Sequence, residues 1–598
     1  MAAENAVAEA AITPWRDRLT ARGIEAMMKS MEAVPMLDRC RGGRLGRGTV
    51  GIAVSSLAVA LLARASATVH LVRPDGTGNY PTIQAAIGAA APGDTIALAD
   101  GRFAGDGNRD LDFSGKELVV HSVSGNPGAC VLDCGGSESD PHHAFRFDSG
   151  DTPTSTLEGI SIVNGWAYSG GAIRCDGAAP TIRNCVFQSN SADDQGGAIW
   201  IRQASPSIED CVFRDDSSVT YGGAICLEYS NAVIMRCEFA ENSSWRGGGV
   251  ECRAPPGSGY SCQLITCSFR GNQATLGGAL EVEGTDVRAT RCDFSDNTAE
   301  LRGGAIGLYS SLTSCHVTAC SLTGNQSQFG GAISASHGEA YLDSCTVAAN
   351  GATLHGGAIW LWYSSLWVSS STISENVAPL GAGISISYLY HDSVVLGNSM
   401  LVLGQGGEAL YWDGTGSGGS IELTCCDVYG NEGGDWVGHI ADQYGIRGNI
   451  SLPPLFCGDA NPAEPYTLRS DSPCAPGFNP DCGLIGAWPV GCDPASCIAS
   501  PAEVPAACSL HAGAPNPFCG STTIRFEVNV AAAMSLAICD VSGRVVRVLD
   551  GETMTRPGEY RVAWDGTDAR GRILAGGVYY VRLRVGPYSG KRPVSLIR

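Results

Sequence analysis

Gly170-Gly171-Ala172-Ile173 is the first of nine related tetrapeptides that recur along the middle of the chain. Successive copies are separated by steps of 26, 26, 25, 30, 26, 27, 26 and 25 residues. They begin at Gly170, Gly196, Gly222, Gly247, Gly277, Gly303, Gly330, Gly356 and Gly381. A fixed period of this size is typical of a solenoid, in which each repeat packs only on its neighbours.

The apolar residues inside each repeat alternate with a period of two, which indicates strands rather than helices. Ile173 and its equivalents are followed two places later by a second apolar column that starts at Cys175. A second motif, Cys185-Val186-Phe187-Gln188-Ser189-Asn190, keeps the same period, and its Phe residues should stack in the core. Short strands and about 26 residues per coil predict an all-β chain with a parallel β-helix.

Gly, Asn and Cys should each have a distinct place in such coils. The Gly-Gly pairs suit corners that need a positive φ or a close backbone approach, and the closing Asn residues suit tight turns in the left-handed region. The repeated Cys column should form a ladder of buried thiols, because the coil spacing of about 4.8 Å is wider than a disulfide prefers. Disulfides are expected instead among Cys457, Cys474, Cys482, Cys492, Cys497, Cys508 and Cys519.

The start of the solenoid is similar to a known superfamily. Asp75 to Ile87, followed by Pro92-Gly93-Asp94-Thr95-Ile96, resembles the opening of pectin-lyase-like right-handed β-helix proteins. In those proteins this stretch forms a short helix that caps the first coil. The repeats themselves resemble those of chlamydial-type polymorphic outer-membrane proteins, which are surface adhesins. The resemblance implies one right-handed parallel β-helix of roughly fifteen coils over residues 68–490.

The pattern changes after a Pro-rich linker predicted at residues 491–507. From 508 to 598, short alternating strands separated by Gly and Asp-Gly turns predict a small antiparallel Ig-like β-sandwich. Its Pro515-Asn516-Pro517-Phe518 opening resembles the C-terminal sorting domain of type IX-secreted proteins and the Ig-like module of flagellar hook-capping proteins. That resemblance implies export, with a secretion machine as a partner.

The N-terminal region also indicates export. Basic residues precede the apolar run Val50 to Ala63, and Ala65-Ser66-Ala67 fits a signal-peptidase site. We therefore expect a signal peptide at residues 36–67, cleaved near Ala67, and no role for residues 1–35. The predicted location is the extracellular space or the outer surface of a bacterial cell, without a stable membrane span. A net charge of −21 argues against nucleic-acid binding.

Two columns flank the Ile column and are expected to point outward. They hold the best catalytic candidate, a cluster of Glu228, Glu251, Arg253, Glu281 and Glu283. Carboxylates on adjacent coils would lie about 5 Å apart, the separation that retaining glycosidases use. The alternative interpretation is a solvated face of mixed charge. A polysaccharide lyase or glycoside hydrolase therefore remains open as a second function.

The favoured interpretation is a non-catalytic, adhesin-like protein that binds a polysaccharide or cell-surface glycan. The same columns contain side chains suited to this role, because aromatic rings offer amphipathic platforms to sugars. The candidates are Trp200, Arg202, Tyr309, Trp360 and Trp362. No cofactor or metal site is predicted, since no Cys-x-x-Cys pair with matching His occurs.

Overall fold

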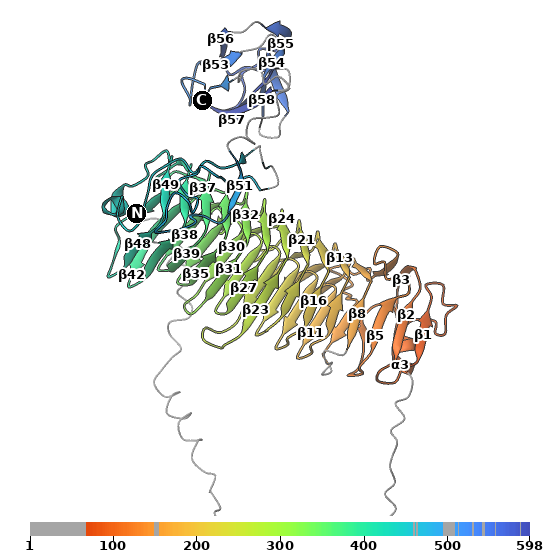
Figure 1. Ribbon diagram of the computed structural model, residues 1–598. Helices are drawn as coiled ribbons and strands as arrows, with labels where there is room; N and C mark the ends of the chain where they lie inside the picture. The colour runs from red at the N-terminus through yellow and green to blue at the C-terminus, as the bar shows by residue number, and fades with distance from the viewer. Residues whose placement is uncertain are drawn as a thin grey trace, which may run out of the picture. The chain divides into compact units, whose positions relative to one another are not determined.

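The repeats wind into a right-handed parallel β-solenoid of about 16 turns in the computed structural model (Figure 1). The structure describes residues 67–148, 155–458, 461, 464–493, 509–511, 513–528, 532–540, 544–555, 558–585 and 588–598. The expected signal peptide, except Ala67, and most of the expected linker lie outside these ranges. No helix in the described part of the chain is long and apolar enough to cross a bilayer.

Three long parallel sheets, here sheets A, B and C, form the sides of the solenoid in the described residues. Sheet A comprises β1 (Val69–Val72), β2 (Thr95–Leu98), β5 (Val119–Ser122), β8 (Thr156–Glu158), β12 (Thr181–Arg183), β16 (Ser207–Glu209), β20 (Val233–Met235), β23 (Ser261–Ile265), β27 (Asp286–Thr290), β31 (Ser314–Thr318), β35 (Glu339–Asp343), β39 (Ser365–Ser369), β43 (Ser393–Gly397) and β48 (Ser420–Thr424). Sheet B comprises β3 (Gly101–Ala104), β6 (Cys130–Asp133), β9 (Ser161–Val163), β13 (Val186–Gln188), β17 (Val212–Arg214), β21 (Glu238–Ala240), β24 (Ser268–Arg270), β28 (Asp293–Ser295), β32 (Ser321–Thr323), β36 (Thr346–Ala348), β40 (Thr372–Ser374), β44 (Met400–Val402) and β49 (Asp427–Tyr429).

Sheet C follows each Gly-Gly corner. It comprises β4 (Leu111–Asp112), β7 (Phe145–Phe147), β11 (Ile173–Asp176), β15 (Ile199–Arg202), β19 (Ile225–Glu228), β22 (Val250–Arg253), β26 (Leu280–Glu283), β30 (Ile306–Tyr309), β34 (Ile333–Ser336), β38 (Ile359–Trp362), β42 (Ile384–Tyr390), β46 (Leu410–Trp412) and, beside β42, β47 (Gly416–Ser417). Shorter strands precede the corners, and we call them the flanking strands. They are β10 (Trp166–Ser169), β14 (Ser191–Gln195), β18 (Ser217–Ser218), β25 (Gln273–Leu276), β29 (Thr298–Arg302), β33 (Gln326–Phe329), β37 (Gly351–His355), β41 (Val377–Ala378) and β45 (Gln405–Gly406).

The Gly-Gly corners confirm both expected roles of glycine. The first glycine of the pair has a positive φ, for example 63° at Gly196. The second lies so close to the next coil that a Cβ at Gly197 would collide with the carbonyl oxygen of Gly223. The expected left-handed conformation of the closing Asn residues is wrong: the residue before each takes it, as at Ser189 with φ 55°.

The Asn side chains instead form a buried hydrogen-bond ladder inside the solenoid. The backbone N–H and the amide Nδ2 of Asn242 both donate to Oδ1 of Asn272 on the next coil, at 3.1 and 2.9 Å. Nδ2 also donates to the Phe213 carbonyl oxygen at 3.1 Å. Each coil is thereby tied to its neighbours through groups that would otherwise be unsatisfied in the core.

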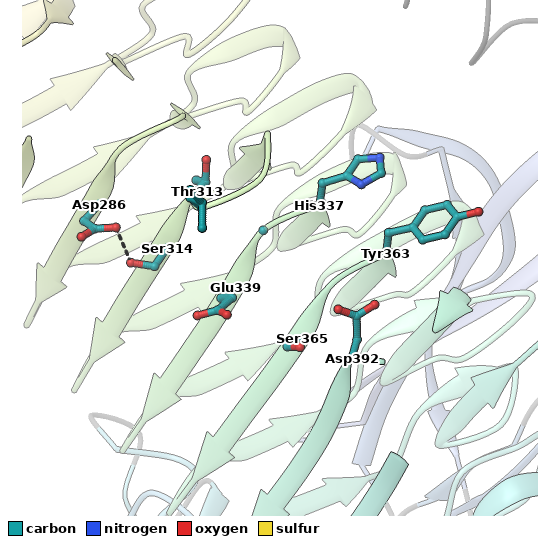
Figure 2. Close-up of a pocket in the computed structure, with 10 residues that line it drawn as sticks. Asp286, Thr313, Ser314, His337, Glu339, Tyr363, Ser365 and Asp392 are labelled. Atoms are coloured by element: carbon teal, nitrogen blue, oxygen red, sulfur yellow. Dashed lines mark hydrogen bonds between the residues drawn. The ribbon is translucent and has the colours of Figure 1, made fainter. Parts of the chain in front are cut away.

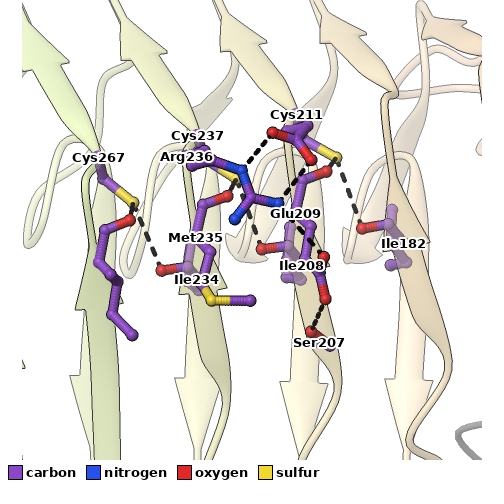
Figure 3. Close-up of polar contacts among 12 residues, drawn as sticks. Ile182, Ser207, Ile208, Glu209, Cys211, Ile234, Met235, Arg236, Cys237 and Cys267 are labelled. Carbon is purple, nitrogen blue, oxygen red and sulfur yellow. Dashed lines mark hydrogen bonds and ion pairs between the residues drawn. The ribbon is translucent and has the colours of Figure 1, made fainter.

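The predicted aromatic stack is confirmed. Phe187, Phe213, Phe239, Phe269 and Phe294 are fully buried, and successive ring centroids lie 4.6 to 4.9 Å apart. The predicted thiol ladder is confirmed as well, because Cys211, Cys237 and Cys267 are buried and unbridged. Each Sγ donates to a carbonyl of the preceding coil, as Cys211 does to Ile182 at 3.7 Å (Figure 3). Burial raises the pKa of the Cys211 thiol well above its ordinary value.

Both ends of the solenoid are covered. Helix α3 (Ile83–Ala89), capped by the Thr82 hydroxyl, buries Ile83, Ala86 and Ile87 and packs on β1, β2 and β4, as the resemblance implied. At the other end, η1 (Gly438–Gln443) and the pair β50 (Leu468–Arg469) and β51 (Val490–Cys492) follow the last coils. Two disulfides lie in this closing segment, Cys457–Cys492 as expected and Cys425–Cys482, whose first member was not among the expected cysteines. Cys474 is a free thiol.

The C-terminal residues form two antiparallel sheets, as expected. One contains β52 (Ser509–Leu510), β53 (Thr522–Val528) and β56 (Gly558–Trp564). The other contains β55 (Val545–Thr555), β54 (Ala532–Cys539), β57 (Gly577–Val585) and β58 (Tyr588–Leu596). Side chains from both sheets, including Phe526, Trp564, Leu536 and Val581, share one hydrophobic cluster, as in a β-sandwich.

Candidate functional site

The outer side of sheet C carries two columns of side chains, and the first of them is buried from Trp200 to Ser385. In the first column, Trp200 is 5% exposed, Glu251 0%, Glu281 3% and Trp360 7%. The expectation that Trp200 and Trp360 are exposed is therefore wrong. Their side chains point away from the solenoid core, yet other side chains of the protein cover them.

The covering groups come from the residue immediately before each Gly-Gly pair. The positive φ of the first glycine turns the chain sharply, so that this residue lies over the first column. Gln195 accepts a hydrogen bond from Trp200 Nε1 at 2.8 Å, and the Phe329 ring packs on Trp360 with centroids 4.9 Å apart. This covering column continues through Tyr221, Arg246, Leu276, Arg302 and His355.

Arg246 holds the predicted carboxylate cluster in place. Its guanidinium is 8% exposed and donates to Glu281 Oε1 at 3.3 Å and to Glu283 Oε2 at 2.7 Å on the next coil. A Cβ at Gly307 would collide with Glu281 Oε2, so the absence of a side chain there makes room for this carboxylate. The register places Glu251 beside Glu281 and Arg253 beside Glu283.

Glu251 is the most enclosed member of this cluster. Neither of its carboxylate oxygens has a hydrogen-bond partner among the residues that the structure describes. Burial, with a further contribution from the charges of Glu281 and Glu283, raises the pKa of Glu251 well above its ordinary value, although Arg246 opposes the shift. Burial thus favours the protonated, neutral form of the Glu251 carboxyl.

The second column is half-buried and divides into two parts. The N-terminal part, here the charged half, consists of Asp176, Arg202, Glu228, Arg253 and Glu283. Its charges are engaged with the protein itself: Arg202 donates to Asp176 at 3.2 Å, and the Arg253 guanidinium lies 4.1 Å from the centroid of the Tyr221 ring. The predicted residues Glu228, Arg253 and Glu283 thus meet on adjacent strands of this half.

The C-terminal part, here the aromatic half, consists of Tyr309, Ser336, Trp362 and Tyr388. A register shift in β42 brings Tyr388, rather than Ser387, opposite Trp362. Ser387 instead accepts a hydrogen bond from Trp360 Nε1 at 2.8 Å. No Lys or Arg occupies this part of the described column.

Trp362 belongs to a group of packed aromatic rings in the aromatic half. The ring of Tyr363 is stacked between His337 and Tyr388, at 5.1 and 4.9 Å, so both of its faces are covered. Trp362 crosses His337 and Tyr363 at 73° and 72°, and therefore packs on their ring edges. The Trp362 side chain remains half-buried, so part of its surface is accessible to an amphipathic ligand.

No group of three His, Cys, Asp or Glu side chains in the described part of the chain is arranged to hold a metal ion. The residues that sequence reasoning missed are the covering column and the corner residues His337 and Tyr363. The covering column had a signal in the sequence, because its members always precede a Gly-Gly pair.

Comparisons with known proteins agree with this architecture. A family model for the right-handed β-helix region matches residues 164–347, and one for the FlgD Ig-like domain matches residues 516–586. No curated protein matches the chain.

Two solved structures are similar to the chain at low identity. One is described as "a new PL6 alginate lyase complex with trisaccharide", with 11% identity, a TM-score of 0.39, and coverage of 65% of this chain and 89% of that one. The other is a mannuronic acid specific polysaccharide family 6 lyase from human gut microbiota, with 14% identity, a TM-score of 0.37, and coverage of 64% and 84%.

Proposed function

We propose that the protein binds a polysaccharide along the outer side of sheet C without cleaving it. The observation that carries the proposal is the aromatic half, where Trp362 and Tyr309 lie half-buried on the outer side of sheet C, two coils apart. Ser336, a small and buried side chain, lies between them in the register. At about 4.8 Å per coil, the backbone positions of the two residues are roughly 10 Å apart, a span suited to an extended glycan.

The flat rings favour sugars over other surface ligands. A sugar ring presents C–H groups on one face and hydroxyls at its edge, and aromatic side chains offer a matching apolar face at low entropic cost. The guanidinium groups of Arg246 and Arg302 lie 5.4 and 5.9 Å from the centroid of the Tyr309 ring and help to fix its position. A prearranged platform of this kind lowers the ordering cost of binding.

The catalytic alternative, a lyase or hydrolase, receives less support from the same geometry. A catalytic acid or base must reach within hydrogen-bond distance of the substrate, whereas Glu251 and Glu281 are covered by Arg246 and the chain before the corner. Glu283 is accessible but is engaged with Arg246. The cluster is better explained as a buried ion-pair network that supports the outer face.

A glycan screen tests the binding proposal against the catalytic one. Immobilised neutral, acidic and amino polysaccharides are offered to the full chain, and the supernatants are assayed for reducing ends and unsaturated products. We expect retention on at least one polysaccharide without product. Product formation that is lost in the Glu283→Gln variant would establish the catalytic alternative and contradict the proposal.

We also propose that residues 508–598 direct export to the cell surface, through a secretion machine that recognises the Ig-like fold. The resemblance to sorting domains supports this assignment, as does the separate hydrophobic cluster of this region. Deleting residues after Ala502 should leave the solenoid folded, because its core cluster is complete without them. In a host with type IX machinery, the truncated protein should remain in the periplasm. Equal surface delivery of both forms would contradict the sorting role.

A further inference from the structure

A pocket of about 280 Å³ lies at the corner where sheet C leads into sheet A, next to the aromatic half (Figure 2). Its floor and rim come from the first residues of four neighbouring sheet A strands and from the corner that precedes them. The lining residues are Asp286, Leu312, Thr313, Ser314, His337, Gly338, Glu339, Tyr363, Ser365 and Asp392. The volume is at the lower end of the range for small-molecule sites and suits one small ring.

The pocket joins the platform described above. His337 and Tyr363 line it and are also the two rings on which Trp362 rests. On its other side, His316, Tyr341 and Trp367 form a second ring stack on sheet A, with centroids 4.4 and 4.5 Å apart. A chain of sugars lying on Trp362 would therefore pass the mouth of the pocket.

Three carboxylates in the pocket are held by neutral groups and by no cation. Ser314 Oγ donates to Asp286 at 2.7 Å, Tyr341 Oη donates to Glu339 at 2.7 Å, and the Tyr390 N–H donates to Asp392 at 3.1 Å. None of the three forms an ion pair with a described residue, unlike Asp176 and Glu283 of the charged half. Each carboxylate is thus oriented and keeps capacity to accept further hydrogen bonds.

The negative charge of the side chains that line the pocket disfavours an anionic ligand. The pocket contains three carboxylates and no Lys or Arg, and burial lowers the pKa of His337, which favours a neutral imidazole. The nearest basic side chain on the same strands, Arg288, lies two residues along β27 and is exposed. A uronate, sulfate or phosphate would meet repulsion there, whereas hydroxyl groups would find acceptors beside apolar walls.

We infer that this corner pocket binds one uncharged sugar unit of the glycan that lies on Trp362, with Asp286, Glu339 and Asp392 accepting hydrogen bonds from its hydroxyls. The inference rests on the proposed glycan-binding function and names its ligand class. Trp362 supplies the stacking surface, and the pocket discriminates against acidic polysaccharides.

Calorimetric titration of the full chain tests the inference with three oligosaccharides: cellohexaose as the uncharged ligand, an oligogalacturonate as the acidic one and a glucosamine hexamer as the cationic one. We expect the uncharged ligand to bind most tightly. The double variant Glu339→Gln/Asp392→Asn should weaken its affinity by about tenfold or more, because two charge-assisted acceptors are lost. The control variant Asp343→Asn removes an exposed carboxylate of β35 outside the pocket and should bind like the unaltered protein.

These measurements distinguish a failure of the pocket inference from a failure of the proposed glycan-binding function. Tighter binding of the acidic or the cationic oligosaccharide would overturn the inference, and so would unchanged affinity in the double variant, while either result leaves glycan binding on sheet C intact. Absence of binding to all three ligands would contradict the proposed function itself. Thermal unfolding of each variant, expected to match the unaltered protein, shows that the fold is retained.

Discussion

The charged and aromatic halves of the second outer column share one backbone but differ in the groups that their side chains engage. In the charged half, Arg202 pairs with Asp176, and Glu283 pairs with the buried Arg246. In the aromatic half, Trp362 packs against His337 and Tyr363 and stays half-buried, without an ion pair. The repeated fold therefore determines the positions of these side chains. Their local interaction partners determine whether they are available to bind a ligand.

The cores beneath the two halves differ as well. The Phe stack ends at Phe294, and the column continues as Leu322, Val347 and Ile373. Phe239→Ala, under the charged half, should lower the free energy of unfolding by about 3–5 kcal/mol because it leaves a large cavity. Val347→Ala, under the aromatic half, should cost less. Urea unfolding measures both.

The Phe239→Ala variant also tests whether the loss of stability is confined to the neighbouring coils. Each coil contacts only its neighbours, so Phe239→Ala should leave the glycan affinity of the aromatic half unchanged while the protein is folded. Loss of glycan binding in Phe239→Ala would show that the halves are not independent. An equal decrease in the free energy of unfolding for Phe239→Ala and Val347→Ala would show the same.

The buried ion pairs of the charged half should be structural. Arg246→Met removes the cation that Glu281 and Glu283 share, and breaking a buried pair in this way costs about 3–5 kcal/mol. The matched control Arg214→Met breaks an exposed pair with Glu238 and should cost less than about 1 kcal/mol. Chemical denaturation gives both values, and similar costs would mean that Arg246 is not a structural anchor.

One position of the Asn ladder carries an ionisable residue, and it makes stability depend on pH. Asp216 replaces Asn, its Oδ2 has no hydrogen-bond partner in the described residues, and burial raises the pKa of Asp216 to about 8. The unfolded chain has an ordinary carboxyl pKa near 4. The folded state therefore binds the proton more tightly, so this stability is complete below about pH 4 and is lost as the pH rises toward about 8.

Asp216→Asn should remove this dependence. By the register of the ladder, the new amide would donate to the Phe187 carbonyl, so the variant should gain about 1–3 kcal/mol at pH 9 and little at pH 4. The exposed neighbour Asp215 provides a control: Asp215→Asn should leave the free energy of unfolding unchanged at both pH 4 and pH 9. Denaturant midpoints at the two pH values decide the matter, and a parallel pH profile for Asp216→Asn and the unaltered chain would contradict the account.

The sequence allowed the inner columns to be predicted but not the state of the outer ones. Ile173, Phe187 and their equivalents repeat with the coil period, and like residues at a fixed period must stack in a solenoid. Trp200 and Glu251 lie in an equally regular column, yet their burial depends on which residue precedes each Gly-Gly pair. The residue type at this position varies, as Gln195, Arg246 and Phe329 illustrate. The burial of the first outer column therefore cannot be predicted from a repeated sequence motif.

The candidate binding site was predicted in part for the same reason. Tyr309 and Trp362 are half-buried on the outer side, as the alternation indicated, and the exposure of their rings depends on tertiary contacts with Arg246, His337 and Tyr363. The register shift in β42, which brings in Tyr388, has no signature in the repeat. The role of these residues in binding remains a prediction.

The most direct test of the account compares one substitution in each half. The affinity of the full chain for cellohexaose is measured by calorimetric titration in the unaltered protein, in Trp362→Ala and in Arg253→Ala. Trp362→Ala should lose about tenfold or more in affinity, while Arg253→Ala should stay within about twofold of the unaltered protein. Equal losses, or a larger loss in Arg253→Ala, would contradict the claim that the aromatic half carries the binding.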